Sequence, residues 1–238
     1  MGILKWDFMF KAIFIILKDG FANTIKLTLV TFIFASLIGL IVALIKIEKV
    51  PVLLPLSHLY TSFFKGTPLM VQILVFYYGI PLVLNSFNDR YGWNINVNDI
   101  PAMIFMYIVF SLCYGAYISE VMRAAILSVD KGQSEAGYTI GMSRFTTFRR
   151  IIFPQALSNA LPNLGNYFVD LVKGTSLAFT ATVLEILAAA KILGGREYKY
   201  FESYLAAAII YWVICTLFQL LFNKVEKISR RHERSENT

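Results

Sequence analysis

LTLVTFIFASLIGLIVALI, residues 27–45, is a stretch of nineteen residues without a charged side chain. About 20 helical residues cross the roughly 30 Å hydrocarbon core of a bilayer, so this stretch predicts a membrane-spanning helix. Further uncharged stretches occupy residues 69–84, 100–119, 151–169 and 203–223. The chain has 238 residues, of which 57% are hydrophobic and 16% charged. This composition excludes an ordinary soluble domain and predicts an all-α integral membrane protein.

The number of spans depends on one more apolar run, residues 177–190, which only Glu185 interrupts. If residues 151–193 crossed the membrane twice, the basic loop before them and the basic tail after residue 223 would lie on opposite sides. Lys and Arg residues gather on the cytoplasmic side of membrane proteins. We therefore expect one crossing there and five in total, with the amino terminus outside and the carboxyl terminus in the cytoplasm. The net charge of +7 then reflects topology, and we expect no nucleic-acid partner.

The domain organisation follows from these spans. Residues 1–20 are expected to form an amino-terminal interfacial segment, 21–225 a single transmembrane domain with a cytoplasmic loop at about 126–153, and 226–238 a basic cytoplasmic tail. Cys113 and Cys215 lie inside apolar runs and are interpreted as packing residues. His58 and His232 are isolated, so we expect neither a metal site nor catalytic residues.

Polar residues recur inside the fourth span. Pro162 is expected to begin a helix, in which Asn163, Asn166, Asp170 and Lys173 follow at spacings of three and four and so share one face. Ionisable groups at membrane depth usually face the bundle interior or a water-filled cavity. The alternative is a structural pair of Asp170 and Lys173 that sets the helix register.

The third span carries a similar pattern. Tyr114, Tyr117 and Glu120 follow at helical spacing, and Arg123 lies one turn further toward the loop. Glu120 is expected either to contact a substrate or to pair with Arg123, and the spacing alone supports both.

Two tripeptides are repeated, Lys-Gly-Thr at residues 65–67 and again at 173–175. Gly- or Pro-interrupted apolar segments in matching positions can be broken helices, whose free backbone groups bind polar substrates near the membrane midplane. Simple helix kinks are the alternative. Neither tripeptide belongs to a G-x-x-x-x-G-K-[ST] sequence, so we do not expect this chain to hydrolyse nucleotide by that machinery.

The basic loop contains a candidate short helix. Ser134 is expected to cap it, Glu135 to lie in its first turn and Gly141 to close it. A short exposed helix of small residues suits docking into a groove, whereas a solvated connector is the alternative.

The loop resembles a known family. Glu135, Ala136, Gly137 and Gly141, followed by Pro154, resemble the EAA loop of bacterial ABC importer permeases, whose coupling helix docks on an ATPase subunit. That family usually has Ala at the third position, so Gly137 is a departure. Gly in place of Ala is expected to weaken the helix by about 1 kcal/mol.

Four blocks extend the resemblance to the polar amino acid importers, of the histidine, glutamine and arginine permease family. They are Phe-Lys-Gly-Thr-Pro-Leu-Met-Val-Gln at 64–72, Ala-Tyr-Ile-Ser-Glu at 116–120, Lys-Gly-Gln at 131–133 and Lys-Gly-Thr-Ser-Leu at 173–177. Their occurrence in this order, across about residues 20–225, makes the resemblance specific.

The resemblance implies the type I permease fold in a bacterial inner membrane. It also implies a second permease subunit, with a homodimer favoured, a pair of ATP-binding subunits and an extracytoplasmic solute-binding protein. ATP and Mg would belong to the ATPase subunits, and this chain would carry no cofactor. The docking residues would be Ser134, Glu135, Ala136, Gly137 and Gly141.

An amino acid needs donors for its carboxylate and acceptors for its ammonium group. The candidate substrate-binding residues are Gln72, Tyr117, Glu120, Asn166, Asp170, Lys173, Thr175 and Ser176. Acids outnumber bases among them, and Glu185 adds another, which favours a basic amino acid, with glutamine as the neutral alternative. An autonomous ion-coupled carrier or channel, or a scaffold without transport activity, would also fit the intramembrane charges.

Overall fold

The computed structural model describes residues 5–93, 96 and 99–229, and within them every regular element is helical. Residues 230–238 of the predicted tail lie outside the described residues, as do residues 1–4, 94–95 and 97–98. In chain order the elements are α1 (Trp6–Ile47), α2 (Leu53–Gly66), α3 (Leu69–Tyr91), α4 (Ala102–Leu127), α5 (Lys131–Thr139), α6 (Arg144–Thr147), the π-helical turn η2 (Phe148–Ile152), α7 (Phe153–Gly174), the 3₁₀ segment η3 (Thr175–Ala181), α8 (Ile186–Glu197) and α9 (Tyr200–Ser229).

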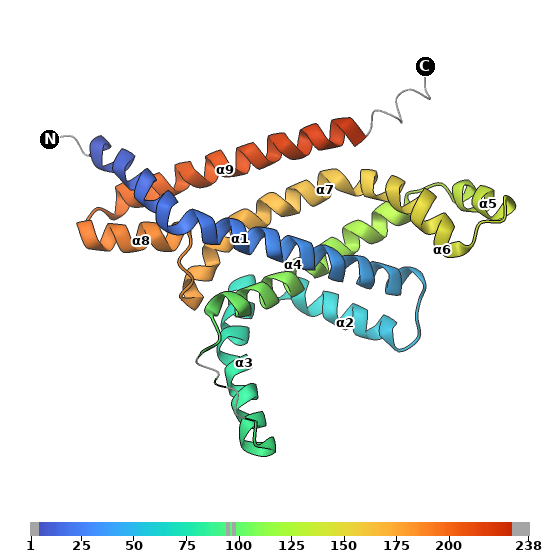
Figure 1. Cartoon of the computed structure of the whole chain (residues 1–238), viewed down its shortest axis with the longest axis horizontal. Helices are drawn as coiled ribbons and strands as arrows, with labels where there is room; N and C mark the ends of the chain where they lie inside the picture. Colours follow the sequence, from blue (N-terminus) through green and yellow to red (C-terminus); the bar gives the residue numbers. More distant parts are fainter. Residues whose placement is uncertain (1–4, 94–95, 97–98, 230–238) are drawn as a thin grey trace.

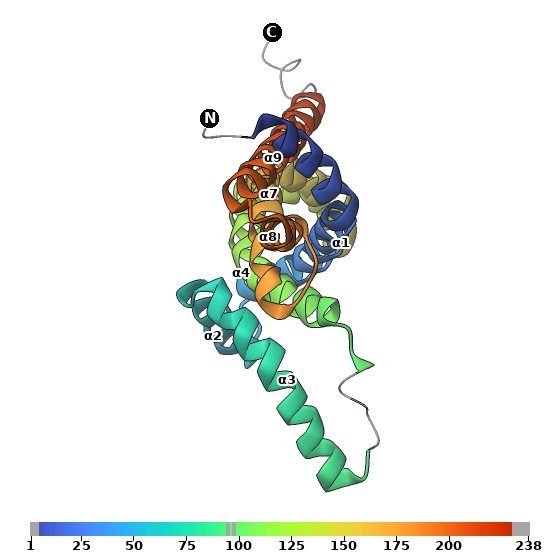
Figure 2. The same cartoon turned by 90° about the vertical axis from the view of Figure 1, so that its left-hand side faces the viewer.

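Helices α1, α4, α7 and α9 form an elongated bundle, and α3 projects away from it (Figures 1 and 2). Helices α1 and α4 approach closely because glycines lie where they meet. A Cβ on Gly39 would lie 2.7 Å from Cγ2 of Ile118, and one on Gly115 would lie 2.9 Å from Cγ2 of Ile38. Small residues let helices approach in this way when lipid, not water, surrounds them.

A second apolar cluster joins the amino-terminal part of α1 to α8 and α9. Ile16 and Ile186 are completely buried there. Gly20 lets α1 cross the start of α8, because a Cβ at this position would lie 2.6 Å from the backbone of Glu185. From Trp6 on, the predicted interfacial segment is therefore helical and packed, and it continues without a break into the first span.

The predicted number of spans agrees with the structure. Four described helices, α1, α3, α4 and α9, are long and apolar enough to cross a membrane. The segment from α6 to η3 and α8, which meet at a bend of 52°, make a fifth when this bent pair is counted as one span. The all-helical architecture with about five spans that the sequence predicts is thus confirmed.

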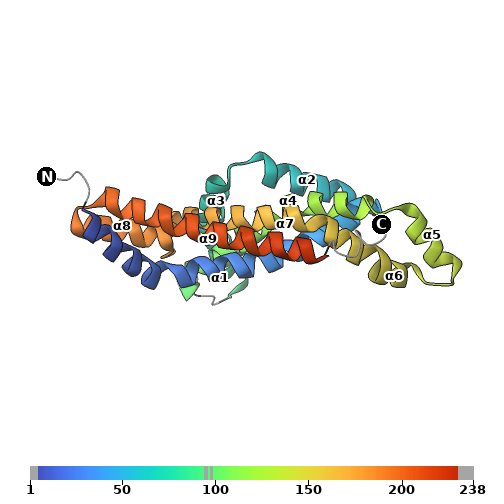
Figure 3. The ribbon, with the colours of Figure 1, turned by 90° about the horizontal axis from the view of Figure 1, so that it is seen from above.

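Basic segments converge at one end of the bundle. The last turn of α1, the end of α4, the loop helices α5 and α6, and the end of α9 all lie at this end, which we call the α5 end (Figures 1 and 3). The side chains of Ser158 in α7 and Ser229 in α9 are hydrogen-bonded at 2.6 Å, so these two elements meet there. This arrangement is the one expected if α7 and α8 make one passage between them.

Both Lys-Gly-Thr tripeptides end helices. Helix α2 ends at Gly66 and α3 begins at Leu69, after Pro68, whose ring cannot continue a helical hydrogen-bond pattern. Helix α7 ends at Gly174, and the chain continues as the tighter η3. The prediction that Pro162 begins a helix was wrong. Pro162 lies inside α7, which starts nine residues earlier, at Phe153.

The helix predicted in the basic loop is present, but its start is earlier. Asp130 is the cap, because its side chain accepts a hydrogen bond from the amide of Gly132, whereas Ser134 lies within α5 and donates to the carbonyl of Lys131. Gly141 closes the helix as expected. It has φ of 78°, and the amides of Gly141 and Met142 bond back to Tyr138 and Gly137, the pattern of a Schellman motif.

Candidate functional site

A polar cleft of about 420 Å³ opens where the α2–α3 break faces α4 and α7. We call it the polar cleft. Its lining residues are Thr67, Leu69, Cys113, Tyr114, Tyr117, Tyr167, Asp170 and Lys173. Of the predicted substrate-binding residues, Tyr117, Asp170 and Lys173 lie in this lining.

The two repeated tripeptides meet at the polar cleft. Thr67 comes from the first and Lys173 from the second, although they are far apart in the sequence. Lys65, in the first tripeptide, places its ammonium group 5.8 Å from the ring centroid of Tyr117. Both helix breaks therefore contribute to one site, which is the arrangement that broken helices provide in transport proteins.

Asp170 and Lys173 form an ion pair across one turn of α7, with 2.8 Å between Nζ and Oδ1. Their side chains are 56% and 57% exposed. A charged pair facing lipid would be costly, and here both groups face a cleft instead. Because so much of each group is uncovered, each retains capacity to bind a further charged or polar partner.

Three tyrosines form the aromatic wall of the cleft. The rings of Tyr114 and Tyr117 are 6.5 Å apart, and those of Tyr117 and Tyr167 are 5.7 Å apart. The hydroxyl of Tyr114 donates to the backbone carbonyl of Asp170 at 3.1 Å. Gly174 permits this approach, since a Cβ there would lie 2.6 Å from that hydroxyl.

Five lining residues, Thr67, Leu69, Cys113, Tyr114 and Tyr167, are absent from the sequence-based site. Two of them could have been predicted from the sequence. Tyr114 precedes Tyr117 by three residues, and Tyr167 precedes Asp170 by three, so each shares a helix face with a predicted site residue.

Gln72 lies outside the cleft lining and is 2% exposed. Its amide nitrogen donates to the carbonyl oxygens of Phe64 and Thr67, at 2.9 and 3.0 Å, and to the Thr67 hydroxyl at 2.8 Å. The side chain thereby satisfies backbone groups that the end of α2 leaves open. Gln72 positions Thr67, which does line the cleft.

The other predicted residues of this region lie around the cleft. Asn166 is exposed on the same face of α7 as Asp170, one turn away. Thr175 is completely buried and donates its hydroxyl to the carbonyl of Val172 at 2.7 Å. Ser176 is half-buried in η3. None of the three is part of the cleft lining.

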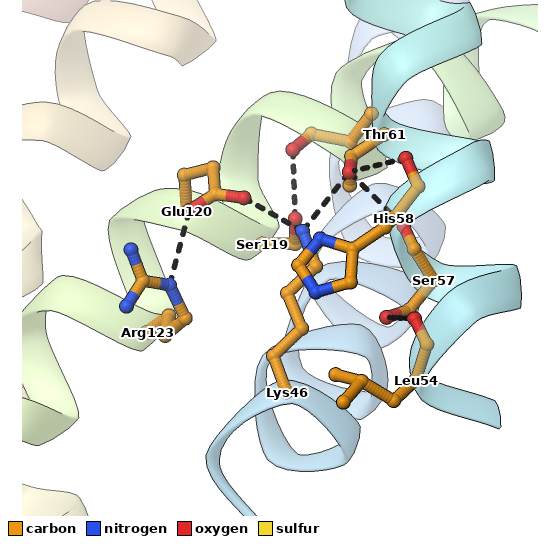
Figure 4. Close-up of polar contacts among 9 residues, drawn as sticks. Lys46, Leu54, Ser57, His58, Thr61, Ser119, Glu120 and Arg123 are labelled. Atoms are coloured by element: carbon orange, nitrogen blue, oxygen red, sulfur yellow. Dashed lines mark hydrogen bonds and ion pairs between the residues drawn. The ribbon is translucent and has the colours of Figure 1, made fainter. Parts of the chain in front are cut away.

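Glu120 belongs to a separate ionic cluster at the α5 end, which Figure 4 shows. Its carboxylate accepts from Nζ of Lys46 at 2.7 Å and from Nε of Arg123 at 3.1 Å. The sequence indicated the Arg123 pair but not Lys46, which is 4% exposed and also donates to the Thr61 hydroxyl at 3.0 Å. This cluster joins α1, α2 and α4.

Glu185 is buried inside the bundle and does not line the polar cleft. It caps α8, accepting hydrogen bonds from the amides of Leu187 and Ala188 and from the hydroxyl of Tyr211 at 2.6 to 2.8 Å. The suggestion that Glu185 adds to an excess of acids around a substrate is not supported by this position.

Helix α5 presents a mixed surface at the end of the bundle. Glu135 and Ala136 are exposed, and Ile140 and Phe145 nearby are 76% and 71% exposed. Gly137 faces inward, where a Cβ would lie 2.8 Å from Cγ2 of Thr147. Gly137, which stands where the family that this loop resembles usually has Ala, therefore lies at a close contact between α5 and α6.

Comparisons with known proteins agree with this architecture. The family described as "Binding-protein-dependent transport system inner membrane component" matches residues 35–231. The "Probable amino-acid permease protein YxeN" of Bacillus subtilis is 42% identical, over 95% of this chain and 96% of the relative. The "L-cystine transport system permease protein TcyB" of the same organism is 40% identical, over 94% of this chain and 91% of the relative.

Solved structures show the same fold. A chain from the crystal structure of an amino acid ABC transporter with histidines superimposes with a TM-score of 0.77 at 30% identity, covering 95% of this chain and 99% of that one. A chain of a methionine ABC transporter gives a TM-score of 0.67 at 15% identity, covering 92% and 97%, and so shares the fold.

The chain belongs to the family of inner-membrane components of binding-protein-dependent transport systems. Within that family, it is a permease subunit of an ABC amino acid importer. Its homologues are transport subunits and not enzymes.

Proposed function

We propose that the polar cleft is the amino-acid site of the translocation pathway. The observation that carries this proposal is the exposed ion pair of Asp170 and Lys173, set beside three tyrosines where both helix breaks meet. The ammonium group of a zwitterionic amino acid can bind the Asp170 carboxylate, and its carboxylate can bind the Lys173 ammonium. The tyrosine rings supply apolar and hydroxyl surface for the side chain.

The substrate we propose is a polar α-amino acid. The cleft lining contains one acid and one base, because Glu120 is paired elsewhere and Glu185 caps a helix. The acid excess that favoured a basic amino acid is therefore absent from the cleft, and the balance suits a neutral zwitterion. The names of two similar proteins mention L-cystine and histidines, which are also polar.

Coupling to ATP is proposed to occur at the α5 end, on the cytoplasmic side of a bacterial inner membrane, with the amino terminus outside. A pair of ATP-binding subunits that carry ATP and Mg would dock on α5 through Glu135, Ala136 and their neighbours. A second permease subunit, in a homodimer, and an extracytoplasmic solute-binding protein would complete the importer. ATP can switch the pathway between two states only if nucleotide is bound differently in them.

Uptake into vesicles by the reconstituted importer tests the proposal, with the twenty amino acids as competitors. We expect Asp170→Asn and Lys173→Gln each to raise the KM about 10- to 100-fold, since a hydrogen bond to a charged group contributes about 1.5–3 kcal/mol. Gln219→Ala is the matched control, because Gln219 is a half-buried residue of α9 that lies outside the cleft lining and is bonded to Asn223. Its KM should stay within about twofold of that of the unmodified chain.

Two results would overturn the proposal. If both cleft variants transported with an unchanged KM, the cleft would not be the amino-acid site. If this chain alone took up amino acids under an ion gradient without nucleotide, it would be an autonomous carrier.

A further inference from the structure

A second groove, of about 430 Å³, lies between α1, α7 and α9, with Met122 of α4 at its base. Its lining is apolar apart from Ser36. Helix α1 contributes Ile33 and Leu37, which are 59% and 53% exposed, and α7 contributes Leu157, which is 37% exposed. We call it the apolar groove. Such a lining can bind only an apolar group.

The apolar groove lies on the side of α7 opposite to the polar cleft. Leu161 and Leu164 line the groove, whereas Asn163 and Asn166 belong to the polar face. Leu161 and Asn163 are two residues apart, as are Leu164 and Asn166, and two residues correspond to about 200° around a helix of 3.6 residues per turn. If the polar face borders the pathway, the groove faces away from it, toward lipid.

The dimensions of the groove match one leaflet. Its lining on α7 runs from Phe153 to Leu164, which is about 16 Å at 1.5 Å per residue. One leaflet contributes about half of the roughly 30 Å hydrocarbon core, or about 15 Å. An acyl chain that entered from the α5 end would therefore be accommodated along its length.

Positive charge lies at the α5 end of the same groove. Arg149 and Arg150 are exposed just before Phe153, and at four and three residues from it they lie on the same side of the helix as this lining residue. The hydrogen bond between Ser158 and Ser229 holds the two helices together at this end. On α9, Glu226 lies one turn after Phe222, whereas Lys224 and Lys227 lie on other faces of that helix, so the positive charge beside the groove comes from the two arginines.

We propose that the apolar groove holds an acyl chain of an anionic phospholipid of the cytoplasmic leaflet, with its phosphate at the cationic residues. Basic pockets between membrane helices on the cytoplasmic side suit anionic head groups. The lipid fills the space between α1 and α9, where side chains alone leave a gap. This site is distinct from the amino-acid site and from the α5 docking surface.

Lipid retention by the purified importer complex tests the proposal. The complex is exchanged into detergent with equal amounts of dioleoyl phosphatidylglycerol and dioleoyl phosphatidylcholine, and the bound lipids are quantified by mass spectrometry. We expect phosphatidylglycerol to be retained preferentially. The double variant Arg149→Gln/Arg150→Gln should lower this preference about 30-fold, since about 1 kcal/mol per cation is about fivefold in affinity.

The control for charge is Lys11→Gln/Lys18→Gln, which removes two exposed cations near the start of α1 and should leave the preference unchanged. Leu157→Trp fills the groove and should reduce retention of both lipids. Its control is Leu217→Trp, on a 62% exposed position of α9 outside the groove lining.

Equal retention of the two lipids by the unmodified complex would overturn the proposal, as would unchanged retention by Leu157→Trp. A disulfide-linked dimer formed by Leu157→Cys, and not by the unmodified chain, would show that a second copy covers the groove and would also overturn it.

Discussion

Gly137→Ala places two effects in opposition, and the structure decides between them. Ala is a better helix former than Gly by about 1 kcal/mol, so local propensity alone predicts a more stable α5. A Cβ at Gly137 would lie 2.8 Å from Cγ2 and 3.0 Å from Oγ1 of Thr147, and 3.3 Å from Cδ1 of Ile151. Thr147 is 1% exposed and β-branched, so it cannot rotate aside easily. Overpacking of this kind costs about 1–3 kcal/mol.

The net expectation is that Gly137→Ala destabilises α5 by about 1 kcal/mol. Hydrogen exchange of the α5 amides in the purified complex measures this locally, and the variant should exchange about fivefold faster. Thr147→Ala removes both atoms that clash, together with a buried hydroxyl that lacks a hydrogen-bond partner. On that background Gly137→Ala should slow exchange about fivefold, because the propensity gain then acts without the clash.

Ala136→Gly is the control for sensitivity. Ala136 is exposed on the same helix, so this change alters propensity without altering packing, and it should speed exchange about fivefold. Slower exchange in Gly137→Ala alone would refute the reasoning. The contact with Thr147 would then be too soft to outweigh one residue's helix propensity.

Two further predictions concern the α5 end. Glu120→Gln should destabilise the purified complex by about 3–5 kcal/mol, because it leaves the buried Lys46 ammonium without its carboxylate. Lys46→Met should cost less than about 2 kcal/mol, because the Glu120 side chain that remains is one-third exposed and still paired with Arg123. Thermal unfolding that ranks the two variants equally or in reverse would contradict this. Glu135→Arg should reduce co-purification with the ATP-binding subunits at least tenfold. Glu197→Arg, which changes an exposed residue at the far end of the bundle, should leave co-purification unchanged. Intact assembly and ATP-coupled uptake in Glu135→Arg would show that the ATP-binding subunits do not dock on α5.

Much of the architecture was predictable from the sequence because its causes are local. Uncharged length alone predicts a spanning helix, since every buried charge is costly in hydrocarbon. The helical period put Asn163, Asn166, Asp170 and Lys173 on one face, and the structure shows all four exposed together. The repeated Lys-Gly-Thr sequences indicated either broken helices or kinks, because Gly and Pro interrupt helical hydrogen bonding, and in the structure both sequences end a helix.

The boundaries were less predictable where competing signals lie close together. Pro162 suggested a helix start, but α7 accommodates it in its interior. Asp130 caps α5 in place of Ser134, because both residue types can cap a helix and only the observed hydrogen bond selects one.

Contacts between helices depended on the tertiary structure. Nothing in the sequence places Lys46 beside Glu120, or Thr67 beside Tyr117 and Lys173 in one cleft. Such pairings are set by how neighbouring helices cross and by the glycines that let them approach, which involve residues far apart along the chain.

The sequence by itself thus determined that this protein lies in a membrane, that it is built from about five apolar spans and which faces of its helices are polar, because charge, length and period act within a single segment. Only the tertiary structure decided that Glu120 and Glu185 are occupied within the protein while Asp170 and Lys173 remain open to a partner. The availability of a charged group depends on what the other helices bring to it, and that is a property of packing.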